Sequence, residues 1–316
     1  MGRIFEGIKV ADFAWVGVGP MAARILADNG ATVVRIESMT RPDPLRVMGP
    51  FKDNVPGINR SWFGTICHCN KYSVSLNLNH PKAAEVGKRF FEWADVVTEA
   101  FTPGQMRKWG LDYEAARKVK PDIIYYSTCM QGQTGPHRFS QGFGLHMAAL
   151  AGFYHVTGWP DRAPVGPYGA YSDFIAGLFM QIALLAALDY RRRTGRGQYI
   201  DLSQLEAALP FLAPPIMDYI VNGRELNRMG NRNPSAAPHG AYPCRGEDRW
   251  VAIAVFSDEE WQSFCRVLGD PDWSKDPRFA TLLARKENED ELDRLIGEWT
   301  IGFTPEQVMA MMQAAG

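Results

Sequence analysis

The sequence predicts an α/β protein with a Rossmann-like large domain built on a parallel sheet, followed by a smaller α+β domain. Residues 8–37 have the pattern strand, glycine turn, helix and strand, and alternating strands and helices recur over 80–127. Such alternation predicts a parallel sheet. Polar, Gly- and Pro-rich sequence then precedes a new strand. We therefore expect a large domain at 1–222, a linker or mobile loop at 223–240 and a small domain at 241–316.

Short-range signals define the first βαβ unit. Residues 8–13 (Ile-Lys-Val-Ala-Asp-Phe) form a strand candidate, and residues 32–37 (Thr-Val-Val-Arg-Ile-Glu) form the next one. Pro20 suits the first position of a helix and Gly30 suits its end, which predicts a helix over 21–29.

The other expected elements follow the same signals. Strands are predicted at 72–76, 95–99, 122–127, 198–202 and 250–255, and helices at 80–94, 102–110 and 111–119, with further helices beginning at Ser203 and Thr304.

A long apolar segment from Phe174 to Leu188 predicts a buried helix, because nearly every face of it is apolar. The segment is shorter than a membrane span and runs into Asp189. Ser172 is a good N-cap residue, which places Asp173 in the first turn, where free N–H groups and the helix dipole favour an anion. Position alone leaves two interpretations of Asp173 open, a capping residue or a catalytic carboxylate.

Composition excludes several classes of protein. The net charge of −1 gives no basis for binding nucleic acid. Five cysteines at irregular spacing form no disulfide framework, which favours a reducing compartment, and the first residues have no apolar signal core. We therefore expect a cytoplasmic protein that spans no membrane. Cys67-His68-Cys69 lacks a second ligand pair at zinc spacing, so no metal is expected.

Gly17-Val18-Gly19 after a strand, with Glu37 ending the next strand, resembles a dinucleotide fingerprint. Pro20 weakens this interpretation, because it removes a backbone donor where a phosphate would lie. A nicotinamide oxidoreductase is therefore the less favoured hypothesis, and no NAD is predicted.

Seven motifs in order carry a resemblance that covers essentially the whole chain. They are 7–13 with Gly19-Pro20, then 30–37, 70–78, 94–104, 132–136, Asp173 with its glycine-bearing helix, and 193–198. Together they resemble the family III CoA-transferases, the group of formyl-CoA transferase and carnitine CoA-transferase (CaiB/BaiF-like).

The resemblance implies that Asp173 is the nucleophile of a CoA-transferase. Its carboxylate would attack a donor acyl-CoA, pass through an aspartyl-CoA thioester and deliver CoA to an acceptor carboxylic acid. Covalent catalysis divides one difficult exchange into easier steps. A helix N-terminus would keep Asp173 ionised, and nearby N–H groups would stabilise an oxyanion.

The family's CoA contacts, transferred by position, fall on the first turn, on the ends of later strands and on the segment before the long helix. They are Val16, Gly17, Arg35, Leu76, Asn77, Ala100, Phe101, Thr102, Arg107, Lys108, Gln141, Gly142 and Phe143. His239 and Gly240 would belong to a loop that covers the reacting thioester. Ser38 and Ala100 depart from the family's usual basic residue and Asn, which leaves Arg35, Arg41, Arg107 or Lys108 for the phosphates.

Two alternatives remain beside the transferase. In α-methylacyl-CoA racemases of this family a His-Asp pair assists the same Asp, but Phe143 and Gly144 stand there and cannot perform acid–base chemistry. His146 lies nearby, but it does not align with either residue of that His-Asp pair. The other alternative is a non-catalytic CoA-binding subunit that partners an active paralogue.

The resemblance also implies an interlocked homodimer, or a heterodimer with a paralogue. The substrates would be CoA esters and small carboxylic acids. Family members return to the large domain after the region that matches Gly316, and this sequence does not contain that return. Aromatic residues near the site give a slight preference for an apolar acid, although such residues more often belong to a core.

Overall fold

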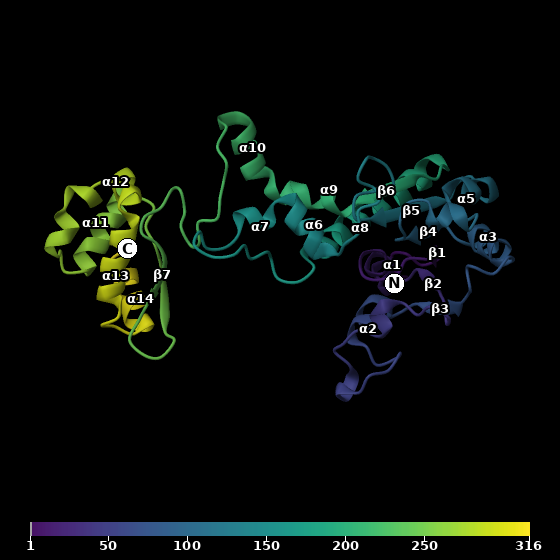
Figure 1. The fold of residues 1–316 in the computed structure, drawn as a ribbon, viewed down its shortest axis with the longest axis horizontal. Helices are drawn as coiled ribbons and strands as arrows, with labels where there is room; N and C mark the ends of the chain where they lie inside the picture. Colours follow the sequence, from purple (N-terminus) through teal and green to yellow (C-terminus); the bar gives the residue numbers. More distant parts are fainter. Residues whose placement is uncertain (1) are drawn as a thin grey trace. The chain divides into compact units, whose positions relative to one another are not determined.

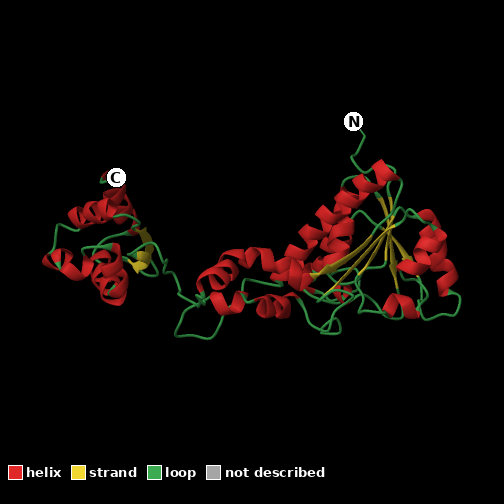
Figure 2. Cartoon of the chain, turned by 90° about the horizontal axis from the view of Figure 1, so that it is seen from above, coloured by secondary structure: helices red, strands yellow, loops and turns green. Residues whose placement is uncertain are grey.

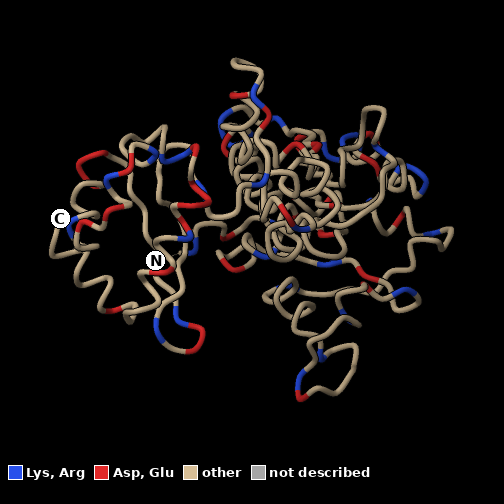
Figure 3. The backbone as a smooth tube through the Cα atoms, turned by 60° about the vertical axis from the view of Figure 1, so that its left-hand side comes forward, with Lys and Arg blue, Asp and Glu red and all other residues tan. Residues whose placement is uncertain are grey.

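The computed structural model describes residues 2–316, which form two compact units (Figure 1). The larger unit comprises residues 2–155 and Gly166–Leu226, and the smaller unit comprises Val156–Val165 and Asn227–Gly316. Lys and Arg positions and Asp and Glu positions are interspersed along the backbone of both units (Figure 3).

The larger unit contains, among the described residues, a six-stranded parallel sheet of strand order β3-β2-β1-β4-β5-β6. Its strands are β1 (Lys9–Asp12), β2 (Thr32–Glu37), β3 (Tyr72–Ser75), β4 (Val96–Glu99), β5 (Ile124–Cys129) and β6 (Tyr199–Ser203). This order is that of a doubly wound Rossmann sheet. The predicted α/β fold class is confirmed.

Helices cover both faces of the sheet (Figure 2). The α-helices of the larger unit are α1 (Val18–Asp28), α2 (Trp62–His68), α3 (Ala83–Trp93), α4 (Gln105–Lys108), α5 (Tyr113–Val119), α6 (Gly144–Ala151), α7 (Phe153–Val156), α8 (Tyr171–Thr194), α9 (Gln204–Ala208) and α10 (Ala213–Asn222). Short 3-10 turns lie at Pro44–Arg46, Lys52–Asn54 and Leu209–Leu212.

Alternating side chains along each strand divide the core of this unit in two. On one face, Val10 and Val33 pack with the apolar sides of α1 and α8. On the other face, Ala11, Ile36 and Val97 pack with residues of α3 and α5. A parallel sheet buried on both faces needs apolar residues at successive positions, which explains the almost continuous apolar strands.

The smaller unit consists of a two-stranded antiparallel sheet and helices. The elements are β7 (His239–Pro243), β8 (Trp250–Ala254), α11 (Asp258–Val267), α12 (Leu282–Glu287), α13 (Glu289–Thr300) and α14 (Pro305–Ala314), with 3-10 turns at Asp272–Lys275 and Pro277–Phe279. Trp261, Phe279 and Ile296 lie in its core. Thr304 caps α14, as predicted.

The units differ from the predicted division at two places. Residues 156–165, expected in the large domain, cluster with the smaller unit, where the Gly230 N–H donates to the Gly158 carbonyl (2.9 Å). Most of the expected linker belongs to the smaller unit as well. Ala237 within it is fully buried, and its N–H donates to the Val255 carbonyl (3.1 Å).

Helix α8 departs from two expectations. Ser172 is not the N-cap: the helix begins one residue earlier, and the Ser172 hydroxyl donates to the Gly144 carbonyl (2.8 Å). The helix is also not buried all round. Four apolar side chains along one face are exposed by 47–63%: Phe174, Leu178, Ile182 and Leu185. Within the described residues, α8 alone has the length and hydropathy of a membrane span, and 39% of that window is buried.

Two glycines of the larger unit should respond oppositely to an added methyl group. A Cβ on Gly197 would lie 2.0 Å from the Ile123 carbonyl oxygen, whereas a Cβ on Gly177 inside α8 would meet nothing within 4 Å in the described structure. We expect Gly197→Ala to lower the free energy of unfolding by about 1–3 kcal/mol. Gly177→Ala should raise it by about 0.5–1 kcal/mol. Urea unfolding followed by circular dichroism measures both, and equal stabilities would contradict this packing.

Candidate functional site

A cavity of about 340 Å³ opens at the carboxyl ends of β1, β4 and β5. Strand order reverses between β1 and β4, and ligands of doubly wound sheets bind at this switch point. The walls come from the turn after β1, the segment after β4, the end of β5, residues 138–143, the start of α8 and the start of α9. The fold thus gathers six separate segments around one cleft.

The turn after β1 has an unusual backbone. Val16 adopts a φ of 65°, a left-handed conformation that is unfavourable for a β-branched residue. Its N–H donates to Oδ2 of Asp43 (3.1 Å), and the same carboxylate pairs with the Arg35 guanidinium (2.7 Å). Burial alone would raise the pKa of Asp43, but hydrogen bonds from His68 and the Leu45 N–H and the charge of Arg35 lower it overall. A charged, buried Asp43 therefore fixes this turn.

Arg35 is consequently engaged inside the protein. Its side chain is 1% exposed, and it contacts Glu37 (3.1 Å) as well as Asp43. Arg46 makes two further contacts of 2.6 Å with Glu37. Arg35 is not positioned to contact a CoA phosphate, and Glu37 is not free to bind a ribose. Arg35, which the sequence offered to a phosphate, and Glu37, the acid of the dinucleotide fingerprint, thus belong to an internal ion cluster.

Asp173 lies in the first turn of α8, as predicted, and faces the start of α6. The Gly144 N–H donates a hydrogen bond to its carboxylate. Burial raises the pKa of Asp173 to about 6, and that hydrogen bond from Gly144 limits the rise. The carboxylate is therefore ionised at neutral pH and weakly solvated, which increases the reactivity of an oxygen nucleophile.

Gly144 approaches Asp173 closely because it has no side chain. A Cβ there would lie 2.7 Å from Cγ of Asp173. The Ser172 hydroxyl donates to the Gly144 carbonyl and joins the two helix starts. Two helix N-termini, those of α6 and α8, thus meet at one carboxylate, and their free N–H groups favour its charge.

The cavity brings together most of the residues predicted from sequence. Asp173 shares it with Val16, Gly17, Ala100, Phe101, Thr102, Gln141, Gly142 and Phe143. The other predicted residues lie outside it. Leu76 packs against the core, and Asn77 is exposed beyond β3. Arg107 and the exposed Lys108 lie on α4, where Arg107 pairs with Asp112 (3.0 Å). His239 and Gly240 belong to β7 of the smaller unit.

Several lining residues escaped the sequence analysis, among them the polar or aromatic side chains of Trp15, Thr128, Arg138 and Gln204. Thr128 follows the pattern of the other strand ends and could have been inferred from the parallel sheet. Gln204 begins α9 and is 4% exposed, and its side-chain oxygen has no hydrogen-bond partner in the described part of the chain. A buried polar atom without a partner is costly, and it suggests a place for a ligand.

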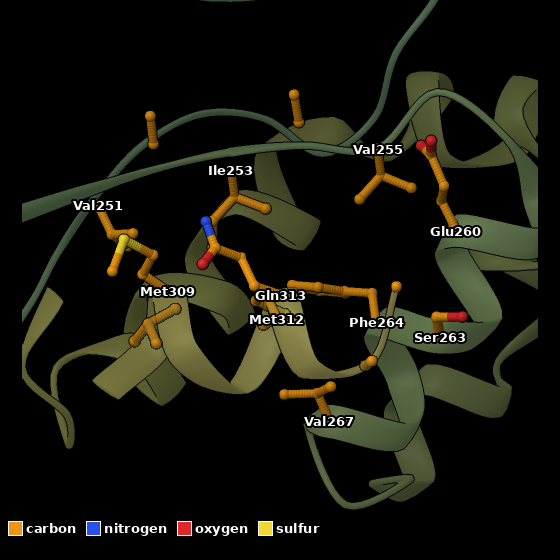
Figure 4. A pocket seen from close by; sticks show the side chains of 15 residues that line it. Val251, Ile253, Val255, Glu260, Ser263, Phe264, Val267, Met309, Met312 and Gln313 are labelled. Carbon is orange, nitrogen blue, oxygen red and sulfur yellow. The ribbon is translucent and has the colours of Figure 1, made fainter. Parts of the chain in front are cut away.

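The smaller unit has a cavity of its own, of about 350 Å³, between β8, α11 and α14 (Figure 4). Val251, Ile253, Phe264 and Met309 give it an apolar lining. Glu260 beside it is occupied as a helix cap, because its carboxylate accepts from the Phe256 N–H (2.6 Å). None of the predicted site residues lines this cavity.

Comparison with known proteins agrees with this geometry. The model of CoA-transferase family III matches residues 5–316. The chain is 33% identical over 314 residues to the succinyl-CoA–D-citramalate CoA-transferase of Chloroflexus aurantiacus, covering 99% of this chain and 77% of that protein. It is 33% identical over 306 residues to the succinate–glutarate CoA-transferase of Agrobacterium fabrum, covering 96% and 76%. The crystal structure of a CaiB/BaiF family protein from Brucella suis superposes with a TM-score of 0.85 at 31% identity, covering 100% and 83%.

Replacing Asp173 by Asn should stabilise the protein in a pH-dependent way. With a folded pKa near 6 and an unfolded pKa near 3.9, the folded state holds the proton more tightly, so the wild type loses stability as the pH rises from about 4 to 6. Asp173→Asn removes this loss. We expect its advantage in urea unfolding to be about 1 kcal/mol larger at pH 8 than at pH 5. Asp189→Asn, an exposed substitution on the same helix, should show no such gain, and a pH-independent effect of Asp173→Asn would contradict the buried charge.

Proposed function

The chain belongs to CoA-transferase family III, and from this membership we propose that it transfers CoA between carboxylic acids through a thioester on Asp173. Close relatives at about one-third identity are named CoA-transferases, which supports transferase activity. The single observation that supports Asp173 as the nucleophile is its buried carboxylate, held ionised at two helix starts inside the switch-point cavity.

The proposed reaction proceeds in two balanced halves. A carboxylate oxygen of Asp173 attacks the thioester carbon of the donor, the carbon–sulfur bond breaks, and CoA leaves as thiolate from a mixed anhydride. The thiolate then attacks the Asp173 carbonyl carbon and releases the donor acid as a carboxylate. The acceptor carboxylate reverses these steps on the aspartyl-CoA thioester. No net proton transfer is required, which fits a site built around a carboxylate and amides.

The residues around Asp173 have separate tasks in this proposal. The Gly144 N–H and the first turn of α8 stabilise negative charge on the carboxylate and on the anhydride oxygens. The Gln204 side-chain oxygen, which has no partner among the described residues, accepts a hydrogen bond from an amide N–H of the bound CoA. Val16, Gly17 and the segment from Ala100 to Thr102 line the path of the pantetheine.

The alternatives receive less support. A racemase needs an acid–base pair at the position of Phe143 and Gly144, and any side chain at Gly144 would collide with Asp173. His146 is occupied with a backbone contact, because its Nδ1 accepts from the Phe143 N–H (3.1 Å).

Lys108 is the exposed cation that we propose for a CoA phosphate.

We also propose a homodimer that uses the exposed apolar face of α8. The side chains of this face recur at helical spacing, as a docking stripe requires. A second copy of the chain is the proposed partner. The interlocked arrangement and a cytoplasmic location remain parts of this proposal.

Asp173→Asn should abolish CoA transfer, because the amide is not a nucleophile. Wild-type protein incubated with an acyl-CoA should gain the mass of CoA less one water on the peptide that contains Asp173, and hydroxylamine should remove the adduct. We expect at least about a 1,000-fold loss of turnover in Asp173→Asn, on the scale of removing a covalent catalyst. Asp189→Asn is the matched control and should keep its activity. Full activity of Asp173→Asn would eliminate the mechanism, and an inactive wild type would favour the non-catalytic subunit.

A charge on the exposed face of α8 should prevent dimer formation. Leu178 is 57% exposed on this face, so Leu178→Glu leaves the packing of the larger unit intact but places a carboxylate in the proposed interface. Sedimentation should show a dimer for the wild type and a monomer for Leu178→Glu. Leu283→Glu, an exposed apolar position of the smaller unit, serves as control. A monomeric wild type, or one that binds lipid vesicles through α8, would contradict the proposed dimer.

A further inference from the structure

A second cavity of about 430 Å³ adjoins the cavity of Asp173. Thr102, Pro103 and Arg138 line both cavities, so the two share a wall. The second cavity is lined by Glu99 at the end of β4, by Tyr125 and Ser127 within β5 and by Tyr199 at the start of β6, and no step of the proposed reaction uses it. A molecule that reacts at Asp173 therefore has room to extend past Arg138.

Arg138 is a cation without a carboxylate partner among residues 2–316. One of its nitrogens donates to the Gly135 carbonyl (3.2 Å), and the guanidinium lies 4.5 Å from the centre of the Phe139 ring. Aromatic stacking fixes the plane of a guanidinium and leaves its edges free to bind an anion in bidentate fashion. Arg107, the other arginine of the second cavity, is already paired with Asp112.

The remaining lining of the second cavity mixes apolar side chains with polar ones, and its carboxylates Asp112 and Glu114 pair with Arg107 and Arg117. It includes the side chains of Ser127, Gln133 and Tyr199 and the carboxyl group of Glu99. Glu99 is 2% exposed and accepts from the Phe101 N–H (2.8 Å). Burial raises the pKa of Glu99 to about 7, so this carboxyl group is protonated in a large fraction of molecules near neutral pH. Glu99 therefore repels an anion less than an ordinary glutamate would.

We propose that Arg138 binds the second carboxylate of a dicarboxylic acid whose first carboxylate exchanges CoA at Asp173. The inference rests on the proposed transferase function and assigns the substrate class of the same site. The acyl group lies against the wall that the two cavities share, and its free carboxylate extends into the second cavity beside Arg138. A monocarboxylic acid of equal length would leave Arg138 without a partner.

Arg138 could instead serve a CoA phosphate, and the two roles predict different selectivity. A phosphate contact affects every acyl-CoA equally, since all carry the same CoA. A contact with the acid affects only acids with a second carboxylate. The discriminating measurement is therefore a comparison of two acyl groups that differ only in that carboxylate.

The experiment is isotope exchange between an acyl-CoA and its own labelled acid. Succinyl-CoA with ¹³C-succinate is compared with butyryl-CoA and ¹³C-butyrate, in the wild type and in Arg138→Gln. We expect the wild type to prefer succinate. Arg138→Gln should lose about 10- to 100-fold in kcat/KM for the succinate pair, the range of one charge-assisted hydrogen-bonded pair, and change less than about 2-fold for the butyrate pair. Arg138→Lys should recover part of the loss.

Controls separate the possible outcomes. Arg192→Gln, an exposed arginine at the far end of α8, should leave both exchanges unchanged, and the affinity of Arg138→Gln for free CoA should match the wild type. Equal losses for both pairs, an unchanged Arg138→Gln, or a wild type that prefers butyrate would each overturn the dicarboxylate assignment while leaving the transferase intact. A wild type that exchanges neither pair nor any other acyl-CoA would overturn the proposed function itself.

Discussion

The buried carboxylate of Asp43 is the constraint on which the cleft depends. It lies in the Pro-rich excursion after β2, yet it receives the N–H of Val16 and the guanidinium of Arg35. A left-handed conformation at a β-branched residue costs on the order of 1–3 kcal/mol and persists only where the surroundings impose it. Here the surroundings are the Asp43 carboxylate, which accepts from the Val16 N–H and is itself held in place by Arg35. The turn that lines the cavity of Asp173 is therefore held by a residue outside the cavity.

Asp173 shows how one geometry serves two opposing needs. Burial makes its carboxylate reactive because it removes water, but the same burial favours the protonated, unreactive form. The N–H of Gly144 and the two helix starts offset part of that cost, so the pKa stays below neutral pH. A larger side chain at Gly144 would displace the carboxylate, so the donor must come from a glycine. The close approach of α6 to Asp173 is thus part of the proposed chemistry.

The sheet was predictable because its signals are local. Strands with apolar faces, Pro20 at a helix start and Gly30 at a helix end require no knowledge of distant contacts. The differences between the prediction and the structure concern contacts with residues far away in sequence. Nothing in the local sequence around Arg35 shows that Asp43 folds back to pair with it. Nothing near Ser172 shows that its hydroxyl donates to Gly144, because Gly144 lies 28 residues earlier. No sequence motif pointed to Arg138, because only the folded chain places it between the two cavities.

Helix α8 carries both the proposed nucleophile and the proposed dimer face. Asp173 stands in its first turn, and the exposed apolar face begins at the next residue, Phe174. A partner seated on that face would fix the helix along its length, and with it the direction of the nucleophile relative to Gly144. Loss of that partner would then weaken catalysis by loosening a contact of a few ångströms rather than by removing a reacting group. In the proposed dimer, the exposed face of α8 would thus couple assembly to the geometry of the proposed nucleophile Asp173.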